Sequence, residues 1–359
     1  MISMAALSTG VTGGVDTHRD THMAAALDHL GRLLEVAQFP ASSAGYRQLL
    51  AWLRGFGPVA RVGVEGTGVW GAGLSRFLTA QAVTVVEVDR PNRRQRRRQG
   101  KSDPTDAVAA ARAVLADHAT VAPKTADGAV ESVRMLRVAR SSAMKARTQA
   151  ANQLHAIVVT APEALRATLR PLTTAALVDH TSRLRPSGDL CDPHAAAKQT
   201  LRALARRWQH LSAEINELDG HLDALVAHAA PTGLLERCGV STDVAGALLV
   251  AAGDNPDRLR SDASFAALCG ASPIEASSGP IVRHRLNRGG NRTANNALWR
   301  VVLVRMRWDQ RTRDYVARRT AEGKTKREII RCLKRYVARE IYRVLRPPPP
   351  PDTRIATGG

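Results

Sequence analysis

The hydrophobic pattern of the first 122 residues changes its period several times in a fixed order. Three short apolar segments come first, between residues 11 and 40, and each has the length and alternation of a strand. Residues 43–55 then show the spacing of an amphipathic helix, and residues 60–89 show strand, helix and buried-strand patterns in turn. Another helix pattern begins at Pro104. Three strands followed by alternating helix and strand predict a mixed α/β sheet flanked by helices.

This connectivity is that of the RNase H-like fold, and it places four acidic residues where a cation site can form. Asp16 lies in the first strand, Glu65 ends the fourth, and Asp103 and Asp106 begin the helix after the fifth. Ligands of open α/β sheets gather at the carboxyl ends of strands. A charge inside an apolar strand is costly unless it is paired or coordinates a cation. The four carboxylates therefore predict one divalent-cation site.

Each acid also has a structural explanation. Asp103 is a suitable helix N-cap, and Asp106 falls in the first turn, facing the positive end of the helix dipole. An ion pair with Arg19 or another base would explain Asp16, and a cap on the following helix would explain Glu65. This alternative predicts four separate contacts and no shared site.

Composition limits the partners. The chain has 359 residues and a formal net charge of +20, so it is long enough for two or three domains and its field attracts polyanions. Nucleic acid is the expected partner rather than a membrane, because no apolar run reaches the roughly 20 residues that span a bilayer. The start has neither a basic region nor an apolar core of signal-peptide length. The cysteines lack the paired spacing of a zinc or disulfide framework and predict reduced thiols in a cytoplasmic protein: Cys191, Cys238, Cys269 and Cys332.

The chain divides into four predicted parts. Residues 1–122 form the α/β domain that carries the four acids, and residues 123–232 form a helical coiled-coil arm with apolar stripes at 130–159 and 193–230. The arm is an antiparallel hairpin within one subunit or, equally, a coiled coil that joins subunits. Residues 233–346 are predicted to be mainly helical, with a helix-hairpin-helix-like start that departs from the usual pattern at 238–241, and residues 347–359 are a disordered or polyproline tail.

Two stretches carry dense positive charge, at residues 93–101 just before the paired acids and at residues 283–292 after two serines. Such runs are often only solvated loops. Arginine forks bind phosphate, however, and Gly289 and Gly290 allow a backbone to approach a phosphate closely. The predicted nucleic-acid-binding residues are Arg93, Arg94, Arg96, Arg97, Arg98, Lys101, Arg283, Arg285, Arg288 and Arg292.

The motifs VDTHRDTH, VEGTGVWG and KSDPTDA, which carry the four acids, resemble the DEDD transposases of the bacterial insertion-sequence family "one hundred and ten". The N-terminal domain of that family is similar to the RuvC junction resolvase. Residues 234–345, with FAALCGASPIEASSG and RGGNRTANNALWR, resemble its C-terminal transposase domain. The resemblance implies that Ser278, the serine before the glycine, is a nucleophile. Ser277 is the neighbouring alternative, and His284 is the one nearby candidate base.

The resemblance implies a recombinase that excises and inserts its own element in donor and target DNA, guided by a structured noncoding bridge RNA. Phosphodiester transfer suits two divalent cations about 4 Å apart, and Mg²⁺ prefers oxygen ligands. We expect a homo-oligomer, dimer or tetramer, in the bacterial cytoplasm at the nucleoid. Two other functions fit the sequence: a resolvase or nuclease that uses the acids and water, and a nucleic-acid-binding protein without activity.

Overall fold

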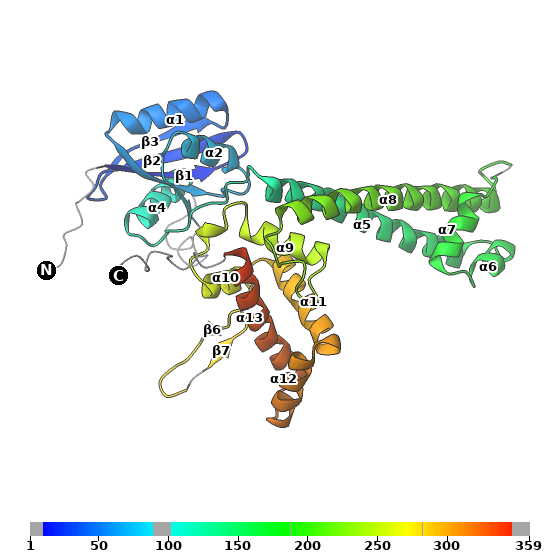
Figure 1. Ribbon diagram of the computed structural model, residues 1–359. Coiled ribbons are helices and arrows are strands. Elements are labelled where there is room, and N and C mark those ends of the chain that lie inside the picture. The colour runs from blue at the N-terminus through cyan, green and yellow to red at the C-terminus, as the bar shows by residue number, and fades with distance from the viewer. Residues whose placement is uncertain (1–9, 89–101, 187, 282, 347–359) are drawn as a thin grey trace, which may run out of the picture. The chain divides into compact units, whose positions relative to one another are not determined.

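The structure is a computed structural model that describes residues 10–88, 102–186, 188–281 and 283–346 (Figure 1). The chain forms two compact units. The first comprises Met1–Gly128 and Ala252–Ser261, and the second comprises Ala129–Ala251 and Asp262–Gly359. A short stretch from late in the sequence, residues 252–261, therefore belongs to the N-terminal unit, and we call it the crossing segment. The four predicted parts of the chain, divided after residues 122, 232 and 346, stay a prediction.

The N-terminal unit contains a five-stranded mixed sheet in the order β3-β2-β1-β4-β5. The strand β1 is antiparallel to β2 and β2 to β3, whereas β1 pairs in parallel with β4 and β4 with β5. This sheet confirms the predicted mixed α/β architecture. The strands are β1 (Val11–Thr17), β2 (Thr21–Leu27), β3 (Leu33–Pro40), β4 (Val59–Glu65) and β5 (Val85–Val88).

Helices cover both faces of this sheet: α1 (Ser43–Gly55) and α2 (Ala72–Ala80) lie on one side and α4 (Asp103–Leu115) on the other (Figure 1). Two consecutive glycines of β1 show why the helices pack closely. A Cβ at Gly13 would lie 3.1 Å from Leu53 of α1, and a Cβ at Gly14 would lie within 2.3 Å of backbone atoms of α4. Successive residues of a strand face opposite sides of the sheet, so the pair opens room for one helix on each face.

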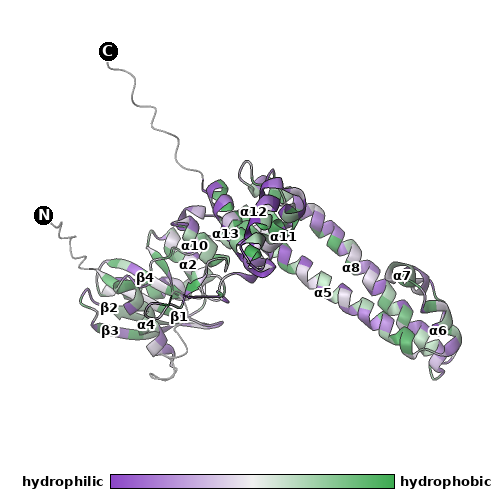
Figure 2. Cartoon of the chain, turned by 90° about the horizontal axis from the view of Figure 1, so that it is seen from below, coloured by the Kyte–Doolittle hydropathy of each residue, from purple (hydrophilic) through white to green (hydrophobic). Residues whose placement is uncertain are grey.

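The second unit begins with two long helices, α5 (Ala129–Thr160) and α8 (Pro193–Ala229), that run side by side (Figure 1). Arg140 of α5 bonds to Asp219 of α8, and seven residues further on Arg147 bonds to Ser212, seven residues earlier on α8. The pairing is therefore antiparallel. Apolar and polar residues are interspersed along both helices (Figure 2).

Two short helices that the sequence did not predict complete the far end of this pair, α6 (Glu163–Leu169) and α7 (Thr174–Ser182). They bury Leu165, Leu169 and Leu177 against apolar residues of the two long helices, including Leu154. The helix that directly precedes α8 in the chain is accordingly α7 rather than α5.

The rest of the second unit is helical, as predicted, apart from one small hairpin. Its buried side chains include Phe265, Leu298, Val302 and Ile341. No described helix is long and apolar enough to cross a membrane. The elements are α9 (Thr242–Ala252), α10 (Asp262–Leu268), β6 (Ile274–Glu275), β7 (His284–Arg285), α11 (Arg292–Trp308), α12 (Gln310–Ala321) and α13 (Lys326–Leu345).

Candidate functional site

The approach of α4 to the sheet determines where the strand acids point. Gly14 of β1 and Gly63 of β4 are partners in the parallel register. A Cβ at Gly14 would lie 2.3 Å from the carbonyl oxygen of Ala107, so only glycine lets α4 lie this close to the strand. Side chains two residues apart on a strand face the same side. Asp16 and Glu65, each two residues beyond one of these glycines, therefore face the α4 side of the sheet.

Three of the four predicted acids are buried: Asp16, Glu65 and Asp106 each have 7% of their surface exposed. Burial raises the pKa of the Asp16 carboxyl; the charge of His18 opposes this rise, and the negative charges of Asp106 and Asp103 add to it. Several carboxylates held in one partly dry place repel one another. Such a cluster favours a bound cation, which would remove that repulsion.

His18 joins two of these acids. Its Nε2 lies 3.2 Å from Oδ2 of Asp16 and 3.4 Å from Oδ1 of Asp103. One ligand atom from each of the three residues lies within 4.8 Å of the other two. Two carboxylates and an imidazole that are this close form a donor set that suits a divalent cation. Asp16, His18 and Asp103 therefore fit a metal site.

The second histidine of the motif VDTHRDTH, His22, lies in different surroundings. His22 is fully buried and stacks on Tyr46 of α1, with 5.7 Å between the ring centroids. Its Nδ1 lies 3.1 Å from the carbonyl oxygen of Thr21. Burial lowers the pKa of His22, so its ring is neutral near pH 7. The side chain of His22 therefore belongs to the core on the opposite face of the sheet from the acids.

The structural explanation of the acids holds only in part. The N-cap of α4 is Ser102 rather than Asp103, whose carboxylate instead turns to His18. Arg19 lies 3.8 Å from Asp20, so the base that pairs with Asp16 among the described residues is His18 and not Arg19. Asp106 does lie in the first turn of α4, where the positive end of the helix dipole favours a carboxylate.

A buried contact behind Glu65 had no sequence signal. Glu65 ends β4, and Thr67, two residues later, donates its hydroxyl to Glu87 Oε1 of β5 at 2.9 Å. The other oxygen of Glu87 accepts from Arg258 of the crossing segment at 3.1 Å, and the Arg258 side chain is only 6% exposed. Since 171 residues separate Glu87 from Arg258, no local pattern can predict this pair. It fixes the turn that follows Glu65.

The two candidate serines lie in the second unit, on the hairpin of β6 and β7. Ser278 and Ile281 exchange backbone hydrogen bonds of 3.1 and 3.2 Å around a turn in which Gly279 has a φ of +56°. The Ser277 hydroxyl accepts from the backbone N–H of Arg283 at 3.1 Å. Ser278 is exposed, and its hydroxyl makes no hydrogen bond to any described residue. Ser277 thus helps to close the hairpin, whereas Ser278 is available at its tip.

The predicted basic residues are only partly covered by the structure. Those after the serines are exposed and form no ion pair within the described ranges: Arg283, Arg285, Arg288 and Arg292. The others lie outside the described residues: Arg93, Arg94, Arg96, Arg97, Arg98 and Lys101.

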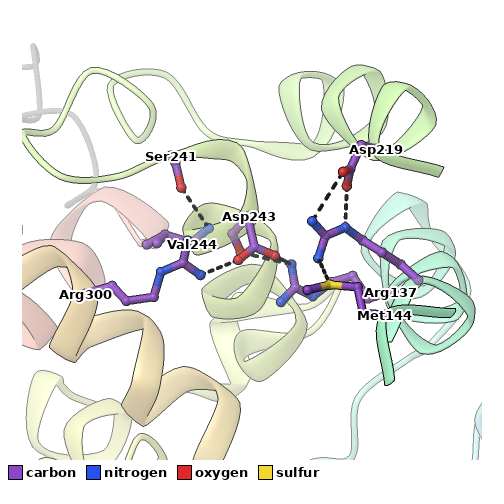
Figure 3. A network of polar contacts seen from close by, with 8 residues as sticks. Arg137, Met144, Asp219, Ser241, Asp243, Val244 and Arg300 are labelled. Carbon is purple, nitrogen blue, oxygen red and sulfur yellow. Dashed lines mark hydrogen bonds and ion pairs between the residues drawn. The ribbon is translucent and has the colours of Figure 1, made fainter. Parts of the chain in front are cut away.

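The helix-hairpin-helix-like start of the C-terminal part is occupied by contacts of the chain itself (Figure 3). Asp243, in the first turn of α9, accepts from Arg137 of α5 at 2.7 Å and also pairs with Arg300 of α11. The hydroxyl of Ser241 accepts from the backbone N–H of Val244 at 3.4 Å. The carboxylate of Asp243 is therefore bound by two arginines of the same chain, and Ser241 caps the helix.

Comparison with known proteins gives a consistent result for both halves of the chain. A family model for DEDD transposases of the IS110 group matches residues 13–161, and a model described as transposase IS116/IS110/IS902 family matches residues 233–317. The chain is 30% identical over 159 residues to the "Insertion element IS110 uncharacterized 43.6 kDa protein" of Streptomyces coelicolor. That alignment covers 44% of this chain and only 37% of the relative. The two family matches include the acidic cluster and the serine hairpin, and the chain belongs to the IS110 family of transposases.

Proposed function

We propose that this protein is a DNA recombinase that excises and inserts an insertion-sequence element, with divalent cations held by the acids and with Ser278 as the nucleophile. The observation that carries the proposal is the cluster beneath α4, in which Asp16, His18 and Asp103 bring ligand atoms within 4.8 Å of one another. Glu65 and Asp106 are buried and lie on the same side of the sheet. Membership of a transposase family supports DNA cleavage and rejoining as the reaction.

The four acids would hold two Mg²⁺ ions, because Mg²⁺ prefers oxygen ligands and accepts substrate phosphate in its shell. When bound, the cations stabilise charge on the attacking and leaving oxygens of a phosphodiester. The chain's own residues orient this site. His18 holds Asp16 and Asp103 in place, and the contact of Thr67 with Glu87 fixes the turn after Glu65.

Ser278 would attack the scissile phosphorus. Its Oγ forms a new bond to phosphorus as the bond to the leaving DNA oxygen breaks, and the hydroxyl proton passes to that oxygen through solvent. A hydroxyl of a second strand later attacks the phosphoserine and releases Ser278. Each step exchanges one phosphoester for another, so rejoining needs no ATP. The guanidinium groups of Arg283 and Arg285 suit the charge that develops on phosphate.

This route requires the acidic cluster and the hairpin to meet in the active assembly, within one subunit or between subunits of a dimer or tetramer. A structured guide RNA would choose the donor and target DNA. The strand order β3-β2-β1-β4-β5 supports an RNase H-like, RuvC-like catalytic domain, and the antiparallel α5 and α8 support a coiled-coil arm. The predicted place in the bacterial cytoplasm, at the nucleoid, stays a prediction.

One observation favours a second function. The acids are assembled within the N-terminal unit without help from the serine hairpin, as a resolvase that cleaves with water would require. The recombinase forms a covalent protein–DNA intermediate, and the resolvase does not. We would incubate the protein and Mg²⁺ with a labelled DNA that carries the element ends, denature the mixture, and map any adduct by peptide mass.

An adduct on Ser278 that Ser278→Ala abolishes and Ser277→Ala retains supports the recombinase. Cleavage without an adduct, or normal recombination by Ser278→Ala, rejects the serine route and favours the resolvase. Neutralising the exposed arginines at 283–292 provides a separate test, since each lost phosphate contact should flatten the dependence of binding on salt by about 0.7–0.9 in the log–log slope.

A further inference from the structure

A basic pocket in the second unit shares only Arg285 with the residues that have a part in the reaction just described. Its volume is about 560 Å³, and it lies between the base of the hairpin and α13. Seven of its lining side chains are lysine or arginine, and only Glu328 is acidic. The basic residues at its centre are Arg285, Arg331, Lys334, Arg335 and Arg339.

The positive charge of this pocket is only partly compensated by the protein. Arg339 donates to Asp262 Oδ2 at 2.7 Å, and Arg335 donates to the carbonyl oxygen of the same residue. Glu328, the acidic lining residue, accepts the hydroxyl and the backbone N–H of Thr325 in the cap of α13. The basic residues Arg285, Arg331 and Lys334 have no carboxylate at ion-pair distance in the part of the chain that the structure describes.

Lys334 lies in surroundings that favour an anion. Its ammonium is partly buried and donates to the neutral Oδ1 of Asn295 at 3.0 Å. Burial lowers the pKa of Lys334, and the charge of Arg331 lowers it further. Holding a cation away from water beside a second cation costs free energy that a bound anion would offset.

The spacing of the arginines in the pocket suits a polymer with regularly spaced negative charges. Arg331, Arg335 and Arg339 follow one another at single-turn intervals on α13, which is about 6 Å apart along the helix at 1.5 Å per residue. An exposed aromatic ring lies beside this row: Tyr336 is 51% exposed and is held edge-on by Tyr315, with centroids 5.6 Å apart. Alternating charge and aromatic surface is typical of sites that bind single-stranded nucleic acid.

We infer that this pocket binds the phosphodiester backbone of a single-stranded segment of nucleic acid, with a base stacked on Tyr336. The inference rests on the proposed function for the presence of a strand but not for any step of the reaction. Since β7 lines the pocket with His284 and Arg285, a bound strand would lie at the base of the hairpin that carries Ser278 at its tip.

Binding of the full-length protein to a fluorescein-labelled 20-nucleotide single strand, followed by anisotropy across a salt series, tests the inference. The double variant Arg331→Gln, Lys334→Gln should bind on the order of tenfold more weakly per lost contact, and its log–log salt slope should fall by about 1.4. The matched control is Arg327→Gln, Arg343→Gln, which removes the same charge from exposed positions of α13 outside the pocket. Tyr336→Leu should weaken binding of the single strand but not of duplex DNA.

Equal binding by the pocket and control double variants would overturn the inference. Ultraviolet crosslinking of wild-type protein should also label residues 324–339, a measurement that does not depend on how the variants fold; its absence there argues against the site. Separate measurements with a DNA strand and an RNA strand show which nucleic acid the pocket binds, and weaker binding of either by the pocket variant supports the inference. The Asp16→Asn variant separates the two proposals. Normal strand binding with unimpaired recombination would reject the metal mechanism and would not affect the inference about the pocket.

Discussion

The carboxylate of Asp243 should stabilise the second unit, because it holds together three helices that are distant in sequence. Its oxygens accept from Arg137 of α5 and pair with Arg300 of α11, while the residue itself begins α9 (Figure 3). The variant Asp243→Asn keeps the size of the side chain and removes its charge. It leaves two arginines without their anion in a partly closed place.

The expected loss of stability follows from the exposed fractions of the paired side chains. The side chains of Arg137 and Asp243 are 18% and 31% exposed, so this pair lies between a buried pair, whose disruption costs about 3–5 kcal/mol, and a surface pair worth about 0–1 kcal/mol. We take about 2 kcal/mol for it. Arg300 is 44% exposed, which limits its pair to about 0.5 kcal/mol. A total of about 2.5 kcal/mol corresponds to a fall in Tm of roughly 5–10 °C for a unit of this size.

Thermal unfolding followed by circular dichroism at pH 7 measures this change, with Asp223→Asn on the exposed side of α8 as the control. Burial raises the pKa of Asp243, but the hydrogen bonds from Arg300 and Arg137 outweigh it and hold that pKa below the ordinary value of 3.8. A depressed folded-state pKa gives stability that is present above the unfolded pKa and is lost as pH falls through the folded pKa. The difference between wild type and variant should therefore persist to about pH 4 and shrink below it. A Tm that matches the control at pH 7 would refute the reasoning.

Three further outcomes are expected. Asp16→Asn and Asp106→Ala should each abolish strand transfer while leaving nucleic-acid binding within about twofold of wild type. Chelation of divalent cations should also abolish strand transfer until Mg²⁺ is restored. Full activity of Asp106→Ala would mean that Asp106 only interacts with the helix dipole. Ser278→Ala should lose the covalent DNA adduct, whereas Ser277→Ala should keep it but loosen the hairpin, as amide exchange at Arg283 would report. Arg258→Gln should lower kcat more than it changes KM and should cost about 1–3 kcal/mol of stability, because it leaves Glu87 partly buried without its partner; equal kcat and lower Tm would mean that the contact is only structural.

The order of elements in the N-terminal unit was predictable because the hydrophobic period stays constant within each strand or helix and changes from one element to the next. The convergence of Asp16 and Glu65 had a signal that was not used: each acid follows a glycine by two residues, and those glycines, Gly14 and Gly63, are the places where α4 touches the sheet. No sequence pattern links His18 to Asp103. Its proximity to Asp103 depends on the position of α4 and not on spacing in the chain.

Other features had no local signal. The helices α6 and α7 have 7 and 9 residues, too few for a hydrophobic period to repeat. The basic pocket combines α13 with β7 and residues near Gly270, so it exists only after the chain has folded back. The N-cap of α4 was misplaced by one residue because serine and aspartate are nearly equal as caps.

The crossing segment has a consequence for how the N-terminal unit is made during translation. Asn255 donates to the carbonyl oxygen of Pro123, 132 residues before it, and Arg258 reaches Glu87, 171 residues before it. At 5–20 residues per second, a ribosome that has synthesised Pro123 needs roughly 7–26 s more to reach Asn255. During that interval the growing chain contains all four acids but not Arg258, the ionic partner of Glu87 beside the turn after Glu65. The unit is therefore completed only after the long helices between its two parts have been synthesised, and a fragment that ends at Gly128 would remain permanently in that unfinished state.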